Sequence, residues 1–336
     1  MSDHRLPRHV LPSHYTLELA PDLSDHTFTG TVAIDVDVVE ATDRIVLNAA
    51  DLVVLDASIL VGGERPPVSV TVDEAAERLV LTVADRLRPG RARLEMTFTG
   101  ELNDRLRGFY RSTLVGADGV ERTIATTQFQ STDARRAFPC FDEPDMKASF
   151  GVTLVVPEGL LAVSNGAEVS RTRLDDGTDR VVFADTIDLS TYLVAFVVGP
   201  LEATEPIDVD GIPVRIIHPP GRADQTAFAL EVAAHSLRWF ADWYDIAVPG
   251  GKVDLVALPD FAFGAMENLG CITFREVLLL VDPTSANQHE LESVAAVISH
   301  ELAHLWFGDL VTMRWWNGIW LNEAFATFME MKAVEA

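Results

Sequence analysis

The sequence predicts an α+β protein in which an antiparallel β domain is followed by an α/β domain. Through the first two hundred residues, apolar and polar side chains alternate along short segments, which is the period of a half-buried strand. Beyond about residue 220, the apolar residues recur at helical spacing instead. At 336 residues, the chain also exceeds what one hydrophobic core usually serves. We therefore expect two domains, at residues 1–220 and 221–336.

The first domain is predicted to be a β-sandwich or a saddle-shaped sheet of short antiparallel strands. In residues 32–38, valine and isoleucine alternate with alanine and aspartate, and residues 79–83 and 94–98 alternate in the same way. Turn residues such as Gly62-Gly63 and Pro89-Gly90 separate these runs. Short strands with frequent turns are typical of two packed layers or of one curved sheet.

The second domain is predicted to mix helices and strands. A helix capped by Asp224 should include residues 228–240, where apolar side chains lie three to five positions apart. A second helix is expected at 291–307, followed by Gly308 as its C-terminal cap. The other expected elements are strands at 253–258, 272–274 and 277–281, a loop at 259–268, and a last helix from about residue 317.

The composition indicates which binding partners to exclude and which cellular compartment to expect. The formal net charge is −25 and no basic cluster occurs, so neither nucleic acid nor an anionic membrane is an expected partner. The two cysteines, Cys140 and Cys271, make no disulfide framework and suit a reducing compartment. The start lacks an apolar signal core, and the longest apolar run is too short to span a bilayer. We expect a cytoplasmic protein, and no pattern specifies its oligomeric state.

His300-Glu301-Leu302-Ala303-His304 is the motif that carries the chemistry. Two histidines four residues apart lie on one face of a helix, so both imidazoles can reach the same ion, and Glu301 beside them can act as a base on water. A catalytic zinc needs three protein ligands and one open position, and Glu323 can supply the third ligand. The alternative is a helix whose polar residues only bond to neighbours, and the later carboxylate disfavours it. The pattern predicts a zinc hydrolase with one zinc ion per chain.

Several segments, taken in order, carry a family resemblance. Gly264-Ala265-Met266-Glu267-Asn268 precedes the histidine motif, and Glu323 lies within Trp320-Leu321-Asn322-Glu323. These segments resemble the zinc aminopeptidases of the aminopeptidase N and puromycin-sensitive type, which are gluzincin metallopeptidases. The other matching segments are Leu11 to Leu17, Arg107 to Ser112, Thr127 to Phe129, Asp142 to Pro144, and Trp306 to Thr312. The resemblance implies an N-terminal portion of such an enzyme, with an incomplete thermolysin-like catalytic domain at 221–336.

The resemblance implies a metal site and a catalytic base. His300, His304 and Glu323 would bind Zn²⁺. Glu301 would take a proton from the attacking water and pass it to the leaving amine. The substrates implied are peptides with a free N-terminus, from which the first residue is removed.

The resemblance also implies a substrate-binding loop. Glu267 would bind the free α-ammonium group of the peptide by charge-assisted hydrogen bonds. The backbone of Gly264 and Ala265 would lie along the substrate, since their small size permits close approach. Met266 and Asn268 complete the loop, although packing explains Met266 better than substrate contact does.

Some positions depart from the family pattern. Gln130 stands where a second carboxylate usually shares the substrate ammonium, so amine binding should be weaker. Leukotriene A4 hydrolase-like relatives also have glutamine there, which keeps a bifunctional epoxide hydrolase-aminopeptidase as an alternative. Leu269 and Gly318 replace a common tryptophan and a common acidic residue.

Two more observations concern the end of the sequence. The transition-state tyrosine of the family lies beyond the last residue, so a non-catalytic fragment is the second alternative. Glu330 lies seven residues after Glu323, on the same face of the predicted helix. It could orient a zinc-binding histidine, or it could be an ordinary surface glutamate.

Overall fold

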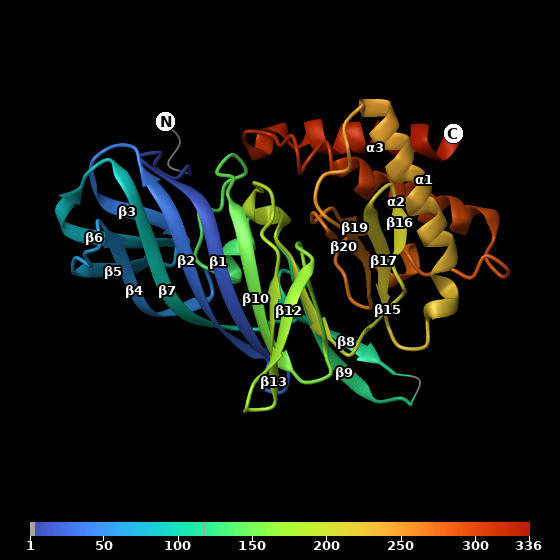
Figure 1. Cartoon of the computed structure of the whole chain (residues 1–336), viewed down its shortest axis with the longest axis horizontal. Helices are drawn as coiled ribbons and strands as arrows, with labels where there is room; N and C mark the ends of the chain where they lie inside the picture. Colours follow the sequence, from blue (N-terminus) through green and yellow to red (C-terminus); the bar gives the residue numbers. More distant parts are fainter. Residues whose placement is uncertain (1–3, 117) are drawn as a thin grey trace. The chain divides into compact units, whose positions relative to one another are not determined.

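The computed structural model describes residues 4–116 and 118–336, which form two compact units that interleave along the chain (Figure 1). The first unit comprises the residues up to Tyr110, Thr127–Glu158 and Glu168–Val194. The second comprises Arg111–Thr126, Gly159–Ala167 and Ala195–Ala336. The domain boundary at residue 220 stays a prediction. The α+β class is confirmed, since strands dominate the first unit and the three α-helices found in the described ranges lie in the second.

The first unit is built on a seven-stranded and a three-stranded sheet. The larger sheet has the order β12-β13-β10-β1-β2-β7-β4, and the smaller has the order β3-β6-β5. β1 and β10 pair in parallel, and the other pairs in these two sheets are antiparallel. The strands are β1 (Val10–Asp22), β2 (Thr27–Val38), β3 (Thr42–Asn48), β4 (Leu52–Val61), β5 (Val68–Asp73), β6 (Arg78–Leu87), β7 (Gly90–Glu101), β10 (Ser149–Pro157), β12 (Glu168–Arg173) and β13 (Thr178–Phe183). Two 3-10 helices, η1 (Ala134–Arg136) and η2 (Thr191–Leu193), complete it.

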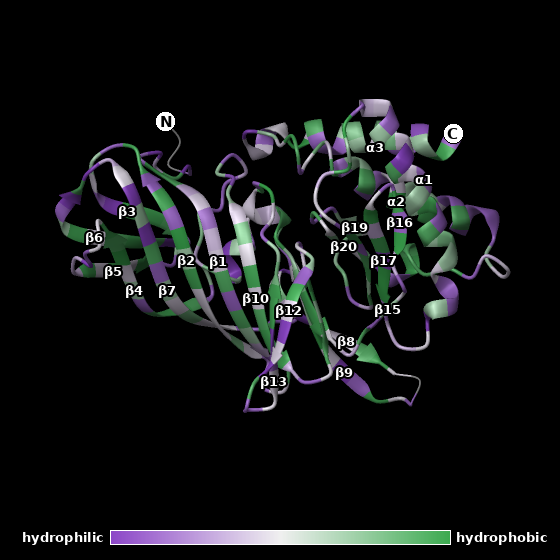
Figure 2. Cartoon of the chain, in the orientation of Figure 1, coloured by the Kyte–Doolittle hydropathy of each residue, from purple (hydrophilic) through white to green (hydrophobic). Residues whose placement is uncertain are grey.

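The predicted alternation of side chains explains how these strands pack. Along β2, every second residue from Phe28 to Val38 is buried, and β7 alternates in the same way. In Figure 2, hydrophilic and more hydrophobic residues follow one another along the ribbons of β2 and β7. Gly30 allows this packing, because a Cβ atom there would lie 2.6 Å from the ring of Phe98 and 2.8 Å from Leu19. One face of the large sheet therefore forms the core of the first unit.

The second unit contains most of a four-stranded sheet and the whole of a six-stranded sheet. The first has the order β11-β14-β9-β8, and the second has the order β15-β17-β18-β20-β19, with β16 pairing β17. The strands are β8 (Gly108–Val115), β9 (Glu121–Gln128), β11 (Leu161–Ser164), β14 (Phe196–Gly199), β15 (Glu202–Ala203), β16 (Ile207–Val209), β17 (Ile212–His218), β18 (Val253–Leu258), β19 (Ala265–Met266) and β20 (Cys271–Arg275). The helices are α1 (Ala227–Tyr244), α2 (Gln288–His304) and α3 (Trp320–Glu335), with 3-10 helices η3 (Ala223–Gln225), η4 (Glu276–Leu278) and η5 (Trp316–Gly318).

The six-stranded sheet has a parallel centre and an antiparallel edge. β17, β18 and β20 are parallel, and α1 connects the first two of them. All six residues of β18 are buried, which is typical of a parallel strand covered on both faces. β19 pairs antiparallel with β20 and is the last strand in the order.

Two of the expected elements in this unit are wrong in detail. The strand expected at 277–281 is replaced by η4 and a turn, because the N–H groups of Leu279 and Leu280 donate to the Glu276 carbonyl instead of to a neighbouring strand. The side chain of Asp224 does not cap α1. Asp224 lies within η3, and the residue before α1 is Thr226, whose hydroxyl donates to the Ala223 carbonyl.

Helix α2 begins three residues before the expected start at residue 291 and ends three residues before the expected end at residue 307. A capping box sets its start: Asn287 Oδ1 accepts from the Glu290 N–H at 3.0 Å, and Glu290 Oε2 accepts from the Asn287 N–H at 2.9 Å. The helix ends at His304, four residues before Gly308. The motif histidines therefore occupy its last two turns.

Helix α3 packs on its neighbours by one face and exposes the other. Its buried residues include Ala326, Met329 and Ala333, and His235 of α1 contacts the Ala333 carbonyl at 2.9 Å. The apolar stripe of α3 is the set of large side chains that are 41–60% exposed: Trp320, Leu321, Phe325, Phe328, Met331 and Val334. Among the described residues, no helix combines the length and apolar character that crossing a membrane requires.

Candidate metal centre and substrate loop

The predicted ligands lie together in the second unit. His300 and His304 belong to the end of α2, and Glu323 lies in the first turn of α3. The Nε2 atoms of the two histidines are 3.1 Å apart. Glu323 Oε2 is 3.4 Å from His300 Nε2 and 3.6 Å from His304 Nε2. One ligand atom from each side chain therefore lies within 4.8 Å of the other two.

This spacing fits a zinc ion. Zinc binds imidazole nitrogen and carboxylate oxygen at about 2.0–2.2 Å, so two ligand atoms of a tetrahedral site lie roughly 3.3 Å apart. The observed separations of 3.1, 3.4 and 3.6 Å fall around this value. Two histidines and one glutamate are also a known donor set of catalytic zinc, and they leave the fourth position to water or substrate.

Both imidazoles are oriented so that Nε2 faces the centre of this group. His304 Nδ1 lies 2.9 Å from the carbonyl oxygen of Phe307, and His300 Nδ1 lies 2.7 Å from Glu330 Oε2. Both partners are acceptors, so Nδ1 carries a proton on each ring and donates it. In the neutral ring this leaves the Nε2 lone pair available to a metal. Glu330 therefore contacts a predicted ligand.

The carboxylates around the two imidazoles favour positive charge at this position. Burial opposes protonation of His300, but hydrogen bonds to Glu323 and Glu330 outweigh it and raise its pKa to about 9. Burial also opposes protonation of His304, and Glu267 and Glu323 raise the pKa of that ring to about 10. The hydrogen bonds to both histidines hold the pKa of Glu323 well below its usual range. A divalent cation would supply positive charge that compensates these carboxylates.

Glu301 lies between the two histidines in sequence and is buried, with 6% of its surface exposed. Burial raises the pKa of its carboxyl group to about 8; the charge of His304 opposes this rise and that of Glu267 adds to it. Across the described ranges 4–116 and 118–336, its Oε2 atom has no hydrogen-bond partner. A buried carboxyl group with a raised pKa, whose oxygen accepts from no donor among the described residues, has the properties of a general base.

The predicted substrate loop begins just before β19, and Glu267 follows that strand directly. Glu267 is 3% exposed; burial raises the pKa of its carboxyl group, while the charge on His304 lowers it. Its Oε1 atom has no hydrogen-bond partner within the part of the chain that the structure describes. Buried polar atoms are almost always paired, so this oxygen is a candidate acceptor for a hydrogen bond from a polar or cationic ligand.

The other loop residues hold the loop against β20. The Gly264 carbonyl accepts from the Arg275 N–H at 2.9 Å. Asn268 is buried, and its Nδ2 donates to Thr273 Oγ1 at 3.2 Å. Met266 is also buried, whereas Gly264 and Ala265 are partly exposed. Asn268 and Met266 therefore support the loop, and the small residues form its accessible part.

A buried lysine holds the chain shortly after this loop, at Gly270, and the sequence motifs do not indicate it. Lys252 is 6% exposed; its Nζ donates to the carbonyl of Ser164 at 2.8 Å, to the carbonyl of Gly270, and to Asp254 Oδ2 at 2.7 Å. Arg215 binds the other side of Asp254, with Nε 2.7 Å from Oδ1. A lone Lys-x-Asp pair is too common in sequences to point to this role.

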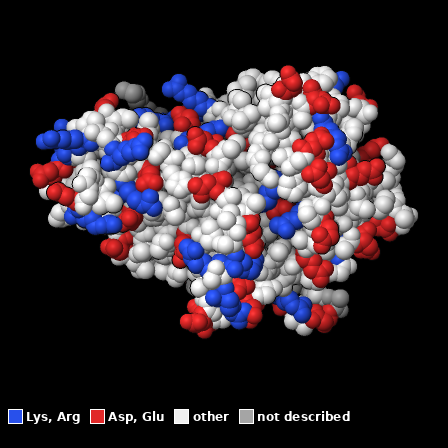
Figure 3. All heavy atoms as spheres, viewed as in Figure 1, with Lys and Arg blue, Asp and Glu red and all other residues white. Residues whose placement is uncertain are grey.

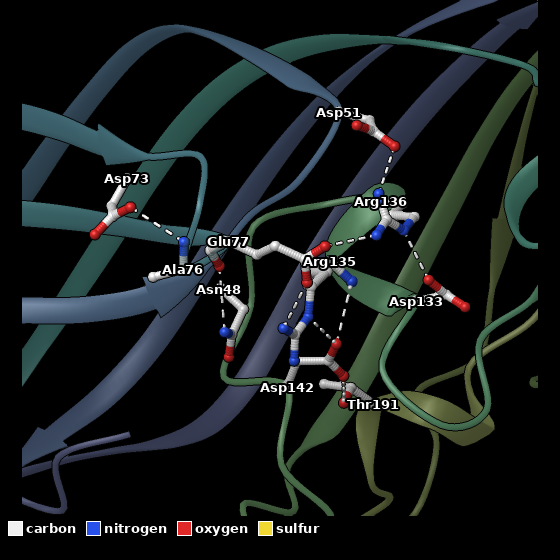
Figure 4. A network of polar contacts seen from close by, with 10 residues as sticks. All are labelled: Asn48, Asp51, Asp73, Ala76, Glu77, Asp133, Arg135, Arg136, Asp142 and Thr191. Carbon is white, nitrogen blue, oxygen red and sulfur yellow. Dashed lines mark hydrogen bonds and ion pairs between the residues drawn. The ribbon is translucent and has the colours of Figure 1, made fainter. Parts of the chain in front are cut away.

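Gln130 belongs to the first unit, in the segment between β9 and η1. Ion pairs hold this segment in place (Figure 4). Arg135 Nε lies 2.9 Å from Oδ2 of the buried Asp142, and both arginines of η1 reach Glu77, at 2.9 and 2.6 Å. Arg136 also pairs with two further carboxylates, those of Asp51 and Asp133.

Comparison with known proteins assigns the chain to a family. Residues 11–193 match the model of the peptidase M1 N-terminal domain, and residues 228–336 match that of the peptidase family M1 domain. The chain is 43% identical over 335 residues to a puromycin-sensitive aminopeptidase of Caenorhabditis elegans. It is 46% identical over 340 residues to aminopeptidase M1 of Arabidopsis thaliana, and 42% identical over 334 residues to endoplasmic reticulum aminopeptidase 2 of Bos taurus.

These matches cover unequal shares of the two partners. They include 97–99% of this chain but only 35–38% of the length of the three relatives. The family models nevertheless account for most of the sequence, and the second of them spans both helices of the metal centre. The chain belongs to peptidase family M1.

Proposed function

We propose that this chain is the zinc-binding part of an aminopeptidase that removes the first residue from peptides with a free N-terminus. The observation that supports this most is the spacing of 3.1–3.6 Å among His300 Nε2, His304 Nε2 and Glu323 Oε2. Peptidases of family M1 are zinc metallopeptidases in general, and the relatives carry aminopeptidase names.

The three residues would hold one zinc ion, and each offers one ligand atom for it. When bound, zinc acts as a Lewis acid and lowers the pKa of water at its open position. Glu301 would take the proton of the attacking water and return it to the amine that leaves, because its carboxyl group is buried and has an unpartnered oxygen within the described ranges.

Glu267 would select the N-terminus of the substrate. Its buried carboxyl oxygen, unpartnered among the described residues, suits an ammonium group, which offers several donors and one positive charge. The accessible residues Gly264 and Ala265 lie at the edge strand of the sheet, where an extended peptide can add as a further strand. The weaker amine binding expected from Gln130 stays a prediction from the sequence.

Turnover of an aminoacyl-chromophore substrate, with and without a chelator, tests the proposal. Glu301→Gln should abolish turnover but keep the metal, because the amide cannot accept the proton, whereas His300→Ala should lose both. Glu292→Gln, which changes an exposed glutamate of the same helix, is the control and should retain both. Turnover that a chelator leaves untouched, or an active Glu301→Gln variant, would contradict the mechanism.

A second candidate is a module that binds zinc without turnover. All four tyrosines precede the metal motif, and Tyr15, Tyr110 and Tyr192 are fully buried. Neither α2 nor α3 therefore offers a phenol to stabilise the transition state, which is a contribution of several kcal/mol in other enzymes. Stoichiometric zinc with no measurable turnover would favour this candidate. A cytoplasmic location stays a prediction, and one relative is named for the endoplasmic reticulum.

A further inference from the structure

The two predicted histidine ligands are oriented by hydrogen bonds to different parts of the chain. His304 is held within its own segment, because its Nδ1 donates to the carbonyl of Phe307, three residues later. His300 is held by another helix, because its Nδ1 donates to Glu330 Oε2 on α3, thirty residues further along the chain. The orientation of His300 therefore depends on α3.

Helix α3 contributes two glutamates from one face. Glu323 and Glu330 are seven residues apart, and at 3.6 residues per turn this spacing brings both side chains to nearly the same side. Glu323 Oε2 lies 3.4 Å from His300 Nε2, and Glu330 Oε2 lies 2.7 Å from Nδ1 of the same ring. One helix thus contacts both nitrogens of this imidazole.

The contact with Glu330 differs from that of an ordinary surface glutamate. Its side chain is 22% exposed and that of His300 is 19% exposed, so water only partly competes for the hydrogen bond. A separation of 2.7 Å is typical of a charge-assisted hydrogen bond, which is roughly twice as strong as a neutral one.

We propose that Glu330 is a positioning residue for His300, which fixes the Nδ1–H tautomer and the ring orientation so that Nε2 already faces the metal position. The proposal rests on the zinc site proposed above and adds to it a residue outside the ligand set. A carboxylate that accepts from Nδ1–H also makes Nε2 a better electron donor. Loss of such a partner typically lowers metal affinity about 10–100-fold.

Zinc dissociation constants of the 336-residue chain, measured by competition with a chromophoric chelator, test the proposal. Glu330→Ala should raise the constant about 10–100-fold. Glu330→Gln should raise it less, because the amide oxygen can still accept from Nδ1–H. Glu335→Gln is the matched control, since this glutamate is exposed on the last turn of the same helix, and it should leave the constant unchanged.

Cobalt substitution separates positioning from a loss of helix packing. Co²⁺ accepts the same nitrogen and oxygen ligands, and its visible absorption reports the geometry of the ligand set. Glu330→Ala should change this absorption, and Glu330→Gln should restore most of the parent spectrum. Glu330→Met fills a similar volume but cannot accept the bond from Nδ1–H, so its spectrum should change as that of Glu330→Ala does. A parent-like spectrum for Glu330→Met would mean that Glu330 only helps α3 to pack, and the proposal would be wrong.

Each remaining outcome decides the question. An unchanged zinc constant in a folded Glu330→Ala variant overturns the proposal. If circular dichroism shows that this variant is unfolded, Glu330→Gln decides instead: an unchanged constant overturns the proposal and a several-fold increase supports it. A parent chain that binds zinc but hydrolyses no peptide contradicts the proposed aminopeptidase activity and leaves the role of Glu330 standing.

Discussion

Gly308 lies against the histidine that precedes it by four residues. Its φ of +148° is a conformation that side chains rarely adopt, and a Cβ atom there would lie 3.2 Å from the His304 carbonyl oxygen and 3.3 Å from His304 Nδ1. The adjacent Phe307 carbonyl accepts the hydrogen bond that orients the same ring. A glycine at this position therefore permits the chain to turn closely around a predicted zinc ligand.

Gly308→Ala should weaken both the fold and the metal site. Strain at such a backbone conformation costs about 1–3 kcal/mol, and the added methyl group would push the His304 ring from its position. Urea unfolding of the metal-free protein and a zinc titration measure the two effects. Gly251→Ala is the control, because nothing lies within 4 Å of its Cβ position. Equal stability and equal zinc affinity in both variants would show that the close approach is unimportant.

The elements show what the sequence could and could not predict. Alternation identified β2 and β7, and the i, i+4 spacing identified the face that carries His300 and His304, because both depend on local periods. The apolar run at 277–281 has no period, so it could not separate a strand from the observed turn. The parallel pairing of β1 with β10 and the contacts of Lys252 join distant segments, and no local pattern encodes them.

The capping box at the start of α2 gives a prediction for one element. Asn287→Ala should remove the acceptor for the Glu290 N–H and lower the free energy of unfolding by about 1 kcal/mol. Asn287→Ser should recover most of this loss, since a serine oxygen can cap as well. Zinc affinity should not change, because His300 lies about 20 Å further along the helix axis. Equal stability of the alanine and serine variants in urea unfolding would argue against the capping role.

At the scale of the whole molecule, the second unit is assembled from three separate stretches of chain. Lys252 joins two of them, because it donates to Ser164 in the short stretch 159–167 and to Gly270 beside the substrate loop. On the face shown in Figure 3, acidic and basic side chains are interspersed.

Burial alone would raise the pKa of Asp254, but Lys252 and Arg215 outweigh it and lower the pKa below its usual range.

Asp254→Asn should therefore destabilise the protein in a way that depends on pH. A lowered pKa in the folded state means that the carboxylate stabilises the fold above its unfolded-state pKa of about 4, and that this contribution is lost as the pH falls through the folded-state value. The variant should lose about 3–5 kcal/mol at pH 7, since Lys252 is left buried without its ion pair. The difference from the parent in urea unfolding should shrink below about pH 4. A difference that is constant with pH would contradict this role.

The apolar stripe of α3 has a consequence for how the metal centre responds to its surroundings. The helix that bears Glu323 and Glu330 also presents six large hydrocarbon surfaces to water, and covering such surfaces releases about 25 cal/mol for each Å². A partner that bound this stripe and reduced the motion of α3 would also hold Glu323 and Glu330 in place. Binding at the stripe and binding of the metal would then favour each other by the same factor, because such coupling is reciprocal.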